Sequence, residues 1–160
     1  MASGDSLITF DPRCYLPPLT LPRAALNLRT DRPVLAFDAA VVERAYVTGV
    51  MPRHYSGGGI TARLMWTAAT ATTGSVQWSL ALERHAPTFD LDGESFGTTG
   101  SVTATTNVVS GAPAYTDLAL AAAALGGLLA GEHFRLVLAR AADAGMVGDA
   151  QLYSVELRET

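Results

Sequence analysis

The sequence predicts an all-β protein, an antiparallel two-sheet sandwich of the jelly-roll type preceded by an extended N-terminal arm. From residue 34 onward the apolar residues recur mostly with a period of two, which is typical of strands with one buried face. Five of the eight prolines lie within the first 33 residues, where they oppose both a stable helix and a central strand. We therefore divide the chain into a proline-rich arm, residues 1–33, and a β-sandwich domain, residues 34–160.

The arm carries apolar residues that a disordered linker usually lacks. Leu19 and Leu21, and again Leu26 and Leu28, stand two residues apart, as in an extended segment with one apolar face. Ordering such an arm costs on the order of 30 to 60 kcal/mol. Burial of roughly 1,300 to 2,600 Å² of apolar surface, the scale of an intersubunit interface, would offset that cost. We predict an interface formed by Tyr15, Leu16, Leu19, Leu21, Leu26 and Leu28. An arm that packs on its own domain is the alternative.

Eight segments of the chain have strand character, with alternating, β-branched or aromatic residues between turn signals. They are residues 33–38, 42–50, 59–69, 74–84, 101–109, 115–121, 132–141 and 150–159. The alanine- and leucine-rich stretch 114–131 favours helix by composition, so we predict one helical turn after the strand at 115–121. A long connection with turn chemistry covers residues 85–100.

Two of these segments each place a tryptophan on the predicted inner face. Residues 59–69 and 74–84 alternate in phase, and we predict that they form an antiparallel hairpin across the sequence TATT. The predicted hairpin core is Leu64, Trp66, Val76, Trp78 and Leu80.

Composition excludes several classes of function. The net charge of −4 and the scattered arginines provide no basic surface for nucleic acid. No apolar run approaches the roughly 20 residues that cross a bilayer, so we expect no membrane partner. The start of the chain lacks a basic segment followed by an apolar one, so no secretory signal is expected. Cys14 is the single cysteine, which excludes an intrachain disulfide and a cysteine-based zinc site.

No motif in the sequence selects a catalytic residue. The stretch HYSGGGI, residues 54–60, lacks the lysine of a P-loop and the spacing of a dinucleotide site, and is interpreted as a turn before a strand. The three histidines are isolated, and DLDGES at 90–95 fits a solvated acidic turn better than a calcium loop. Glu83 and Glu132 are one of many carboxylate pairs that no spacing selects for glycosidic chemistry. We expect no catalytic, metal or cofactor-binding residue, no cofactor and no enzyme activity, a hydrolase being the least favoured alternative.

The order of short motifs along residues 37–159 resembles a set of tailed-bacteriophage virion proteins. The matching positions include the end of one strand with its glycine turn, the tryptophan segments, FGT at 96–98 and the last loop. They are Met51, Pro52, Tyr55, Gly57, Gly58, Trp66, Thr67, Ala68, Ala69, Gly74, Val76, Trp78, Phe96, Gly97, Thr98, Arg140, Asp143 and Asp149. A small jelly roll with an arm is similar to capsid decoration, or cement, proteins. This resemblance implies a homotrimer on the head exterior, made in the host cytoplasm, with the major capsid protein as its partner.

Two functional hypotheses follow. The first is a non-enzymatic structural virion protein that decorates and stabilises the capsid, its arm clasping a sister subunit or the capsid protein. The alternative is a carbohydrate-binding jelly-roll module of a phage head or tail fibre, with a surface glycan as ligand and Trp66 and Trp78 as a stacking platform. Because both tryptophans fall on predicted inner faces, core packing is favoured for them.

Overall fold

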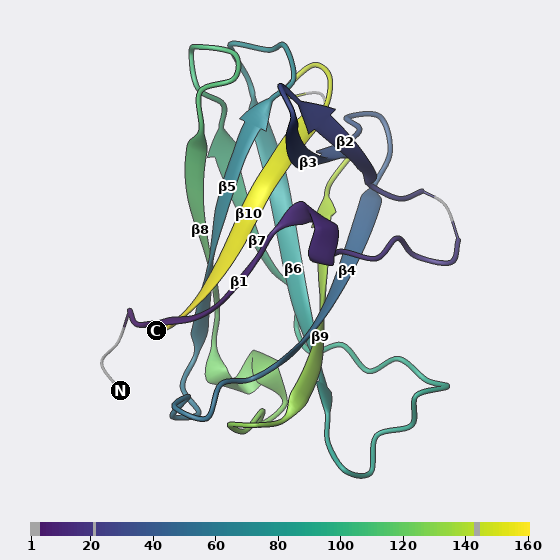
Figure 1. The fold of residues 1–160 in the computed structure, drawn as a ribbon, viewed down its shortest axis with the longest axis vertical. Helices are drawn as coiled ribbons and strands as arrows, with labels where there is room; N and C mark the ends of the chain where they lie inside the picture. The colour runs from purple at the N-terminus through teal and green to yellow at the C-terminus, as the bar shows by residue number, and fades with distance from the viewer. Residues whose placement is uncertain (1–3, 21, 143–144) are drawn as a thin grey trace.

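The computed structural model describes residues 4–20, 22–142 and 145–160, which form two antiparallel β-sheets packed face to face (Figure 1). One sheet has the strand order β2-β3-β10-β5-β8, with β1 also pairing with β10, and the other has the order β4-β9-β6-β7. The strands are β1 (Ser6–Phe10), β2 (Ala25–Arg29), β3 (Arg32–Phe37), β4 (Glu43–Val50), β5 (Ile60–Ala68), β6 (Ser75–His85), β7 (Gly100–Thr105), β8 (Ala114–Leu120), β9 (His133–Arg140) and β10 (Ala150–Glu159). The predicted all-β sandwich is confirmed.

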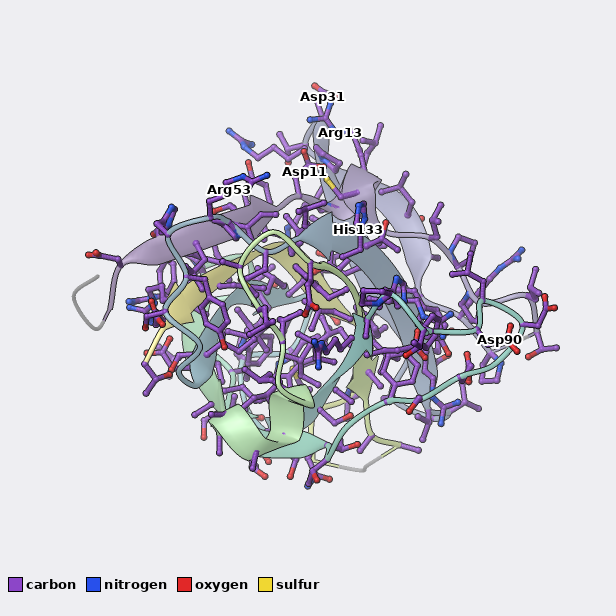
Figure 2. All side chains as sticks on the ribbon, turned by 90° about the horizontal axis from the view of Figure 1, so that it is seen from below. Asp11, Arg13, Asp31, Arg53, Asp90 and His133 are labelled. Atoms are coloured by element: carbon purple, nitrogen blue, oxygen red, sulfur yellow. The ribbon has the colours of Figure 1, made fainter. Side chains whose placement is uncertain are left out.

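The core fills the space between the sheets, as the packed side chains in Figure 2 show. Every second residue of β5, from Ile60 to Ala68, is buried, as its period of two predicts. Aromatic rings meet at the centre: the ring of Trp78 lies 5.2 Å from that of Phe37 and 5.8 Å from that of Trp66, each edge to face. The indole N–H of Trp66 donates to Thr116 Oγ1 at 2.9 Å, which satisfies a buried donor.

The predicted hairpin between 59–69 and 74–84 is wrong. β5 lies in the six-stranded sheet between β10 and β8, whereas β6 lies in the four-stranded sheet between β9 and β7. The five predicted core residues, Leu64, Trp66, Val76, Trp78 and Leu80, are all buried. Alternation identifies the buried face of a strand but not its partner, and a connection that crosses between sheets buries the same residues as a hairpin. Gly74, with φ of 101°, makes this crossing, and a Cβ there would collide with the Gly145 carbonyl.

The arm begins as part of the sandwich. β1 pairs with β10 and buries Leu7 and Phe10. These residues therefore pack on their own domain, which was the alternative prediction for the arm. β2 forms a hairpin with β3. Between β1 and β2, η1 (Pro12–Cys14) leads into a segment that runs outward beyond β4 (Figure 1). The sequence patterns did not predict β1 or β2.

The predicted interface residues of the arm differ in their surroundings. Tyr15 packs against the protein's own core, its ring edge-on to Phe10 at 6.5 Å. Four leucines, by contrast, are exposed to solvent: Leu16, Leu19, Leu26 and Leu28. Leu21 lies outside the described residues. Contact of these leucines with another molecule stays a prediction.

The connection after β8 packs against the sandwich, whereas the outer part of the connection between β6 and β7 does not. The predicted helical turn after β8 is η2 (Ala122–Leu125), whose last residues are buried. The long connection between β6 and β7 projects away from the sandwich, with Asp90 near its outer end (Figures 1 and 2). Among the described residues, no helix has the length and apolar character needed to cross a membrane.

Candidate ligand-binding cleft

A cleft of about 630 Å³ lies on the outer face of the four-stranded sheet. Strands β4, β9 and β6 form its floor, and we call it the sheet cleft. One wall is arm residues 16–20, and the other is the projecting connection, from Phe89 to Glu94. The cleft therefore joins three parts of the chain that are far apart in the sequence.

Strand alternation determines which side chains reach the floor. In β9 the residues on either side of Arg135 are buried in the core, so Arg135 itself points outward. The strand register then aligns Thr48 of β4, Arg135 of β9 and Glu83 of β6 in one row across the sheet. Residues at directly paired positions of neighbouring strands have side chains in contact range, so this row produces an arginine–carboxylate pair.

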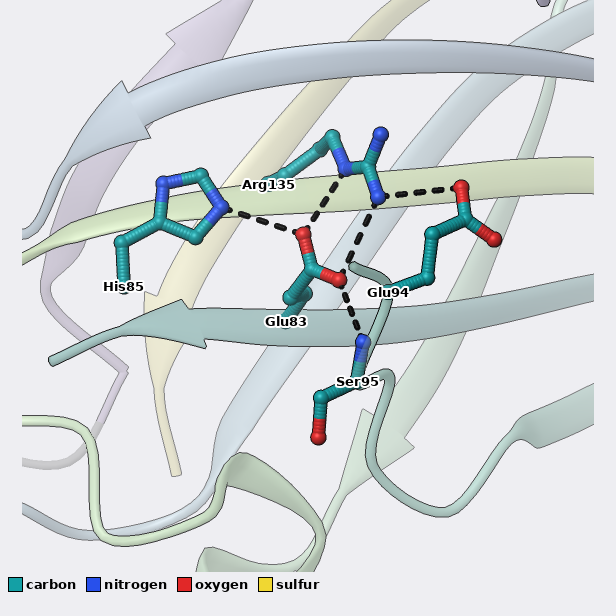
Figure 3. A network of polar contacts seen from close by, with 5 residues as sticks. All are labelled: Glu83, His85, Glu94, Ser95 and Arg135. Carbon is teal, nitrogen blue, oxygen red and sulfur yellow. Dashed lines mark hydrogen bonds and ion pairs between the residues drawn. The ribbon is translucent and has the colours of Figure 1, made fainter. Parts of the chain in front are cut away.

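Glu83 is the centre of a polar network (Figure 3). Arg135 donates from Nε to Glu83 Oε1 at 2.9 Å and from Nη2 to Glu83 Oε2 at 3.2 Å, the forked geometry of a strong ion pair. The Ser95 backbone N–H donates to Oε2 at 2.6 Å, and His85 Nε2 donates to Oε1 at 3.1 Å. Arg135 Nη2 also donates to Glu94 Oε1 at 3.1 Å. The network ties the projecting connection to the floor of the cleft.

The charge of Glu83 follows from these contacts. Its side chain is only 1% exposed, and burial by itself raises the pKa of a carboxyl group. The hydrogen bonds from Ser95, Arg135 and His85 outweigh burial and hold the pKa of Glu83 below its ordinary value. Glu83 is therefore a carboxylate at neutral pH, and its oxygens are already occupied by donors.

Aromatic rings lie beside this network. The Arg135 guanidinium carbon lies 5.1 Å from the centre of the Tyr46 ring and 4.9 Å from that of Phe96. The His85 ring is stacked on Phe89 at 4.5 Å. The floor and one wall of the cleft thus combine flat apolar surfaces with fixed polar groups, which is the usual composition of a small-molecule site.

The structure does not bring together the residues that were weighed from the sequence as possible catalytic groups. Glu83 binds Arg135, whereas Glu132 accepts two hydrogen bonds of 2.7 Å from Arg84, so each carboxylate has its own arginine. Ser56 donates to the Glu159 carboxylate instead of a histidine. Within residues 4–20, 22–142 and 145–160, no group of three or more His, Cys, Asp or Glu side chains could hold a metal ion.

The sequence did not predict the sheet cleft as a binding site. The predicted arm residues Leu16 and Leu19 line its wall, but its floor was missed. A stacking platform made by the two tryptophans is excluded, since both are buried as their inward alternation indicated. A signal was present in β6. Glu83 and His85 are its last outward-facing residues, and they follow the apolar residues 80–82.

No known protein family and no curated protein sequence matches the chain. Solved structures match its fold. The CBM22-1 xylan-binding domain of Paenibacillus barcinonensis Xyn10C aligns with a TM-score of 0.55 and 9% identity, over 99% of this chain and 96% of that one. A carbohydrate-binding module specific for non-crystalline cellulose, CBM28, aligns with a TM-score of 0.50 and 10% identity, over 92% of this chain and 88% of that one.

A part of one enzyme has the same fold. An arabinose-bound α-L-arabinofuranosidase aligns with a TM-score of 0.52 and 9% identity, over 91% of this chain but only 23% of that one. At these identities the likeness establishes a shared β-sandwich fold. No virion protein is among these three structures.

Proposed function

We propose that the protein binds carbohydrate in the sheet cleft and has a recognition role instead of a catalytic one. The observation that carries this proposal is the arrangement of aromatic rings around the Glu83–Arg135 pair on an open sheet face. A sugar ring has an apolar face that can lie against an aromatic ring, while its hydroxyl groups exchange hydrogen bonds with fixed polar side chains. The cleft has both surfaces within one space of about 630 Å³.

Two further points support the proposal, one for carbohydrate as the ligand and one for recognition over catalysis. The fold is shared with a xylan-binding domain and with a cellulose-specific module over nearly the whole length of each. The oxygens of Glu83 are occupied by Arg135, Ser95 and His85, which suits a rigid binding surface better than proton transfer.

The test is a binding measurement on a panel of neutral oligosaccharides that includes soluble xylan and cello-oligosaccharides. We expect at least one to bind, and we expect Phe89→Ala to weaken that binding about tenfold, because the variant removes a ring face at the wall. The matched control is Tyr115→Ala, which removes an exposed ring from β8 in the other sheet. No binding by the folded wild type, or equal losses in both variants, would reject the cleft as the site.

A second candidate function, decoration of a phage capsid as an oligomer, rests on the exposed arm. Leu26 is 57% exposed and Leu28 is 71% exposed, and both lie on β2, which among the described strands pairs with β3 alone. An edge strand with exposed apolar side chains is a surface suited to pairing with another chain. A neighbouring subunit would cover both the leucines and the free strand edge.

Native mass measurement tests this candidate. We expect a trimer for the wild type and a monomer for the Leu26→Ser, Leu28→Ser double variant, while Leu91→Ser, on the projecting connection, leaves the mass unchanged. A monomeric wild type at high concentration, or a trimer that persists in the double variant, would contradict a role of the arm in oligomer formation.

A further inference from the structure

A second pocket, of about 360 Å³, lies where the β2–β3 hairpin, β5 and the connection before β8 meet. It belongs to the six-stranded sheet and shares no residue with the sheet cleft. Its polar lining includes Arg29, Arg32, Thr67 and Tyr153, and none of its lining residues is acidic. We call it the arginine pocket.

The two arginines are directly opposite each other in the hairpin. Arg29 pairs with Arg32 in the strand register, on either side of the turn at Thr30 and Asp31. Like charges at directly paired positions of a sheet destabilise it. Asp31, which marks the tip of the hairpin in Figure 2, forms no ion pair with either arginine in the part of the chain that the structure describes.

The hydrogen bonds of these arginines go to neutral acceptors. Arg29 donates from Nη1 to the Ala68 carbonyl at 2.9 Å and to Gln151 Oε1 at 2.6 Å. Arg32 Nη1 lies 3.4 Å from the Thr30 carbonyl, a long contact. No ion pair joins either guanidinium to a carboxylate of residues 4–20, 22–142 or 145–160, although the protein has a net charge of −4. The pocket therefore holds two positive charges that an anion would neutralise.

The backbone shapes the turn between the arginines and leaves room for Arg29. Thr30 and Asp31 have φ of 47° and 62°, left-handed values that are uncommon for residues with a side chain and rare for a β-branched one. Gly111 has φ of 87°, and a Cβ at this position would lie 2.8 Å from Arg29 Nη2. Glycine thus leaves room for the Arg29 guanidinium, which the bonds to Ala68 and Gln151 fix from the other end.

An aromatic ring borders the same space. The pairing of β10 with β5 shifts its register between Leu152 and Ser154, which leaves Tyr153 as the extra residue of a bulge. Bulges change the direction of a side chain and are frequent next to functional sites. Tyr153 lines the pocket and is 37% exposed, so its ring is available to a ligand held by the arginines.

We propose that the arginine pocket binds an acidic sugar. The carboxylate accepts hydrogen bonds from Arg29 and Arg32, whose planar guanidinium groups match the two oxygens of a carboxylate. The apolar face of the sugar ring rests on Tyr153. This site is independent of neutral glycan binding in the sheet cleft.

The experiment is an NMR titration of the full chain with D-glucuronate, with D-glucose and inorganic sulfate as comparison ligands. We expect glucuronate to shift the backbone amides of Thr67, Gly111 and Gln151 in a saturable way, and to bind more tightly than either comparison ligand. Arg32→Gln should weaken glucuronate binding roughly tenfold, because it removes one charge-assisted hydrogen bond. Tyr153→Ala should weaken glucuronate binding several-fold and leave the response to sulfate unchanged.

The matched control is Arg53→Gln, which removes the same charge from the exposed turn after β4 (Figure 2). It should leave the affinity for glucuronate unchanged. Equal affinity for glucose and glucuronate, sulfate binding as tightly as glucuronate, or equal losses in the Arg53 and Arg32 variants would each overturn the proposal. Arg32 is exposed, and the hydrogen bond that it makes within the described part of the chain is a long one, so its variant is expected to fold. Shifts confined to Ser95 and its neighbours would place glucuronate in the sheet cleft and also overturn it.

Discussion

Replacing Glu83 by glutamine removes the charge at the centre of the sheet cleft and keeps the size of the side chain. Glu83 accepts hydrogen bonds from the Arg135 guanidinium, the Ser95 N–H and His85 while its side chain is 1% exposed. Removing one partner of a buried ion pair costs about 3 to 5 kcal/mol, and the partial exposure of Arg135 reduces that cost. We therefore expect Glu83→Gln to lower the free energy of unfolding by about 2 to 3 kcal/mol at pH 7.

The loss should depend on pH with a defined sign. Because the folded-state pKa of Glu83 is below its ordinary value, the carboxylate stabilises the fold at pH values above the unfolded pKa, about 4.3. That stabilisation disappears as the pH falls through the folded pKa, so the difference between wild type and Glu83→Gln should shrink on acidification. Glu132 and Glu159, whose pKa values are also lowered, are common to both proteins and cancel in the difference.

The assay is urea unfolding followed by the fluorescence of the two buried tryptophans, at pH 7 and at several values below pH 4.5. Glu94→Gln is the matched control, since it removes a carboxylate that binds the same Arg135 but is 62% exposed, and should cost under about 1 kcal/mol. A Glu83→Gln effect that is as small as that of the control, or that does not change with pH, would show that the Glu83 carboxylate does not stabilise the fold.

Further substitutions test the fold around the cleft, each measured as a change in the free energy of unfolding. Arg140→Ala should cost about 3 to 5 kcal/mol, because this fully buried side chain donates to three backbone carbonyls. Phe10→Ala should cost about 3 to 5 kcal/mol if β1 belongs to the core, whereas the exposed Leu28→Ala should cost under about 0.5 kcal/mol. Gly97→Ala should destabilise the protein, because a Cβ there would collide with a backbone carbonyl of η2, and Gly93→Ala should be tolerated.

Much of the fold could be predicted because the period of two is a local property. It located the eight strands from β3 to β10 and the buried faces of β5 and β6. Strand partners are not local, and so the connection between Trp66 and Trp78 was predicted as a hairpin although it crosses between the sheets. β1 and β2 were missed because the prolines around them dominate the composition of residues 1–33, although neither strand contains one.

The sheet cleft could not be predicted for a related reason. Its floor combines Tyr46, Glu83 and Arg135, single outward residues from three strands that only the sheet register brings together. Ser95 and Phe96 come from a segment that was predicted as a loop, and its local sequence does not indicate that it folds back on Glu83. The arginine pocket has the same origin: the close spacing of Arg29 and Arg32 was visible in the sequence, but the turn that pairs them was not predicted.

The most direct test of the central claim is NMR mapping of a bound neutral oligosaccharide, taken from the panel as the tightest binder. We predict that the amides of Tyr46, Phe89, Ser95 and Arg135 shift and saturate together, while those lining the arginine pocket do not. Saturable shifts confined to the six-stranded sheet, or no shifts with any sugar at millimolar concentration, would contradict carbohydrate binding in the sheet cleft.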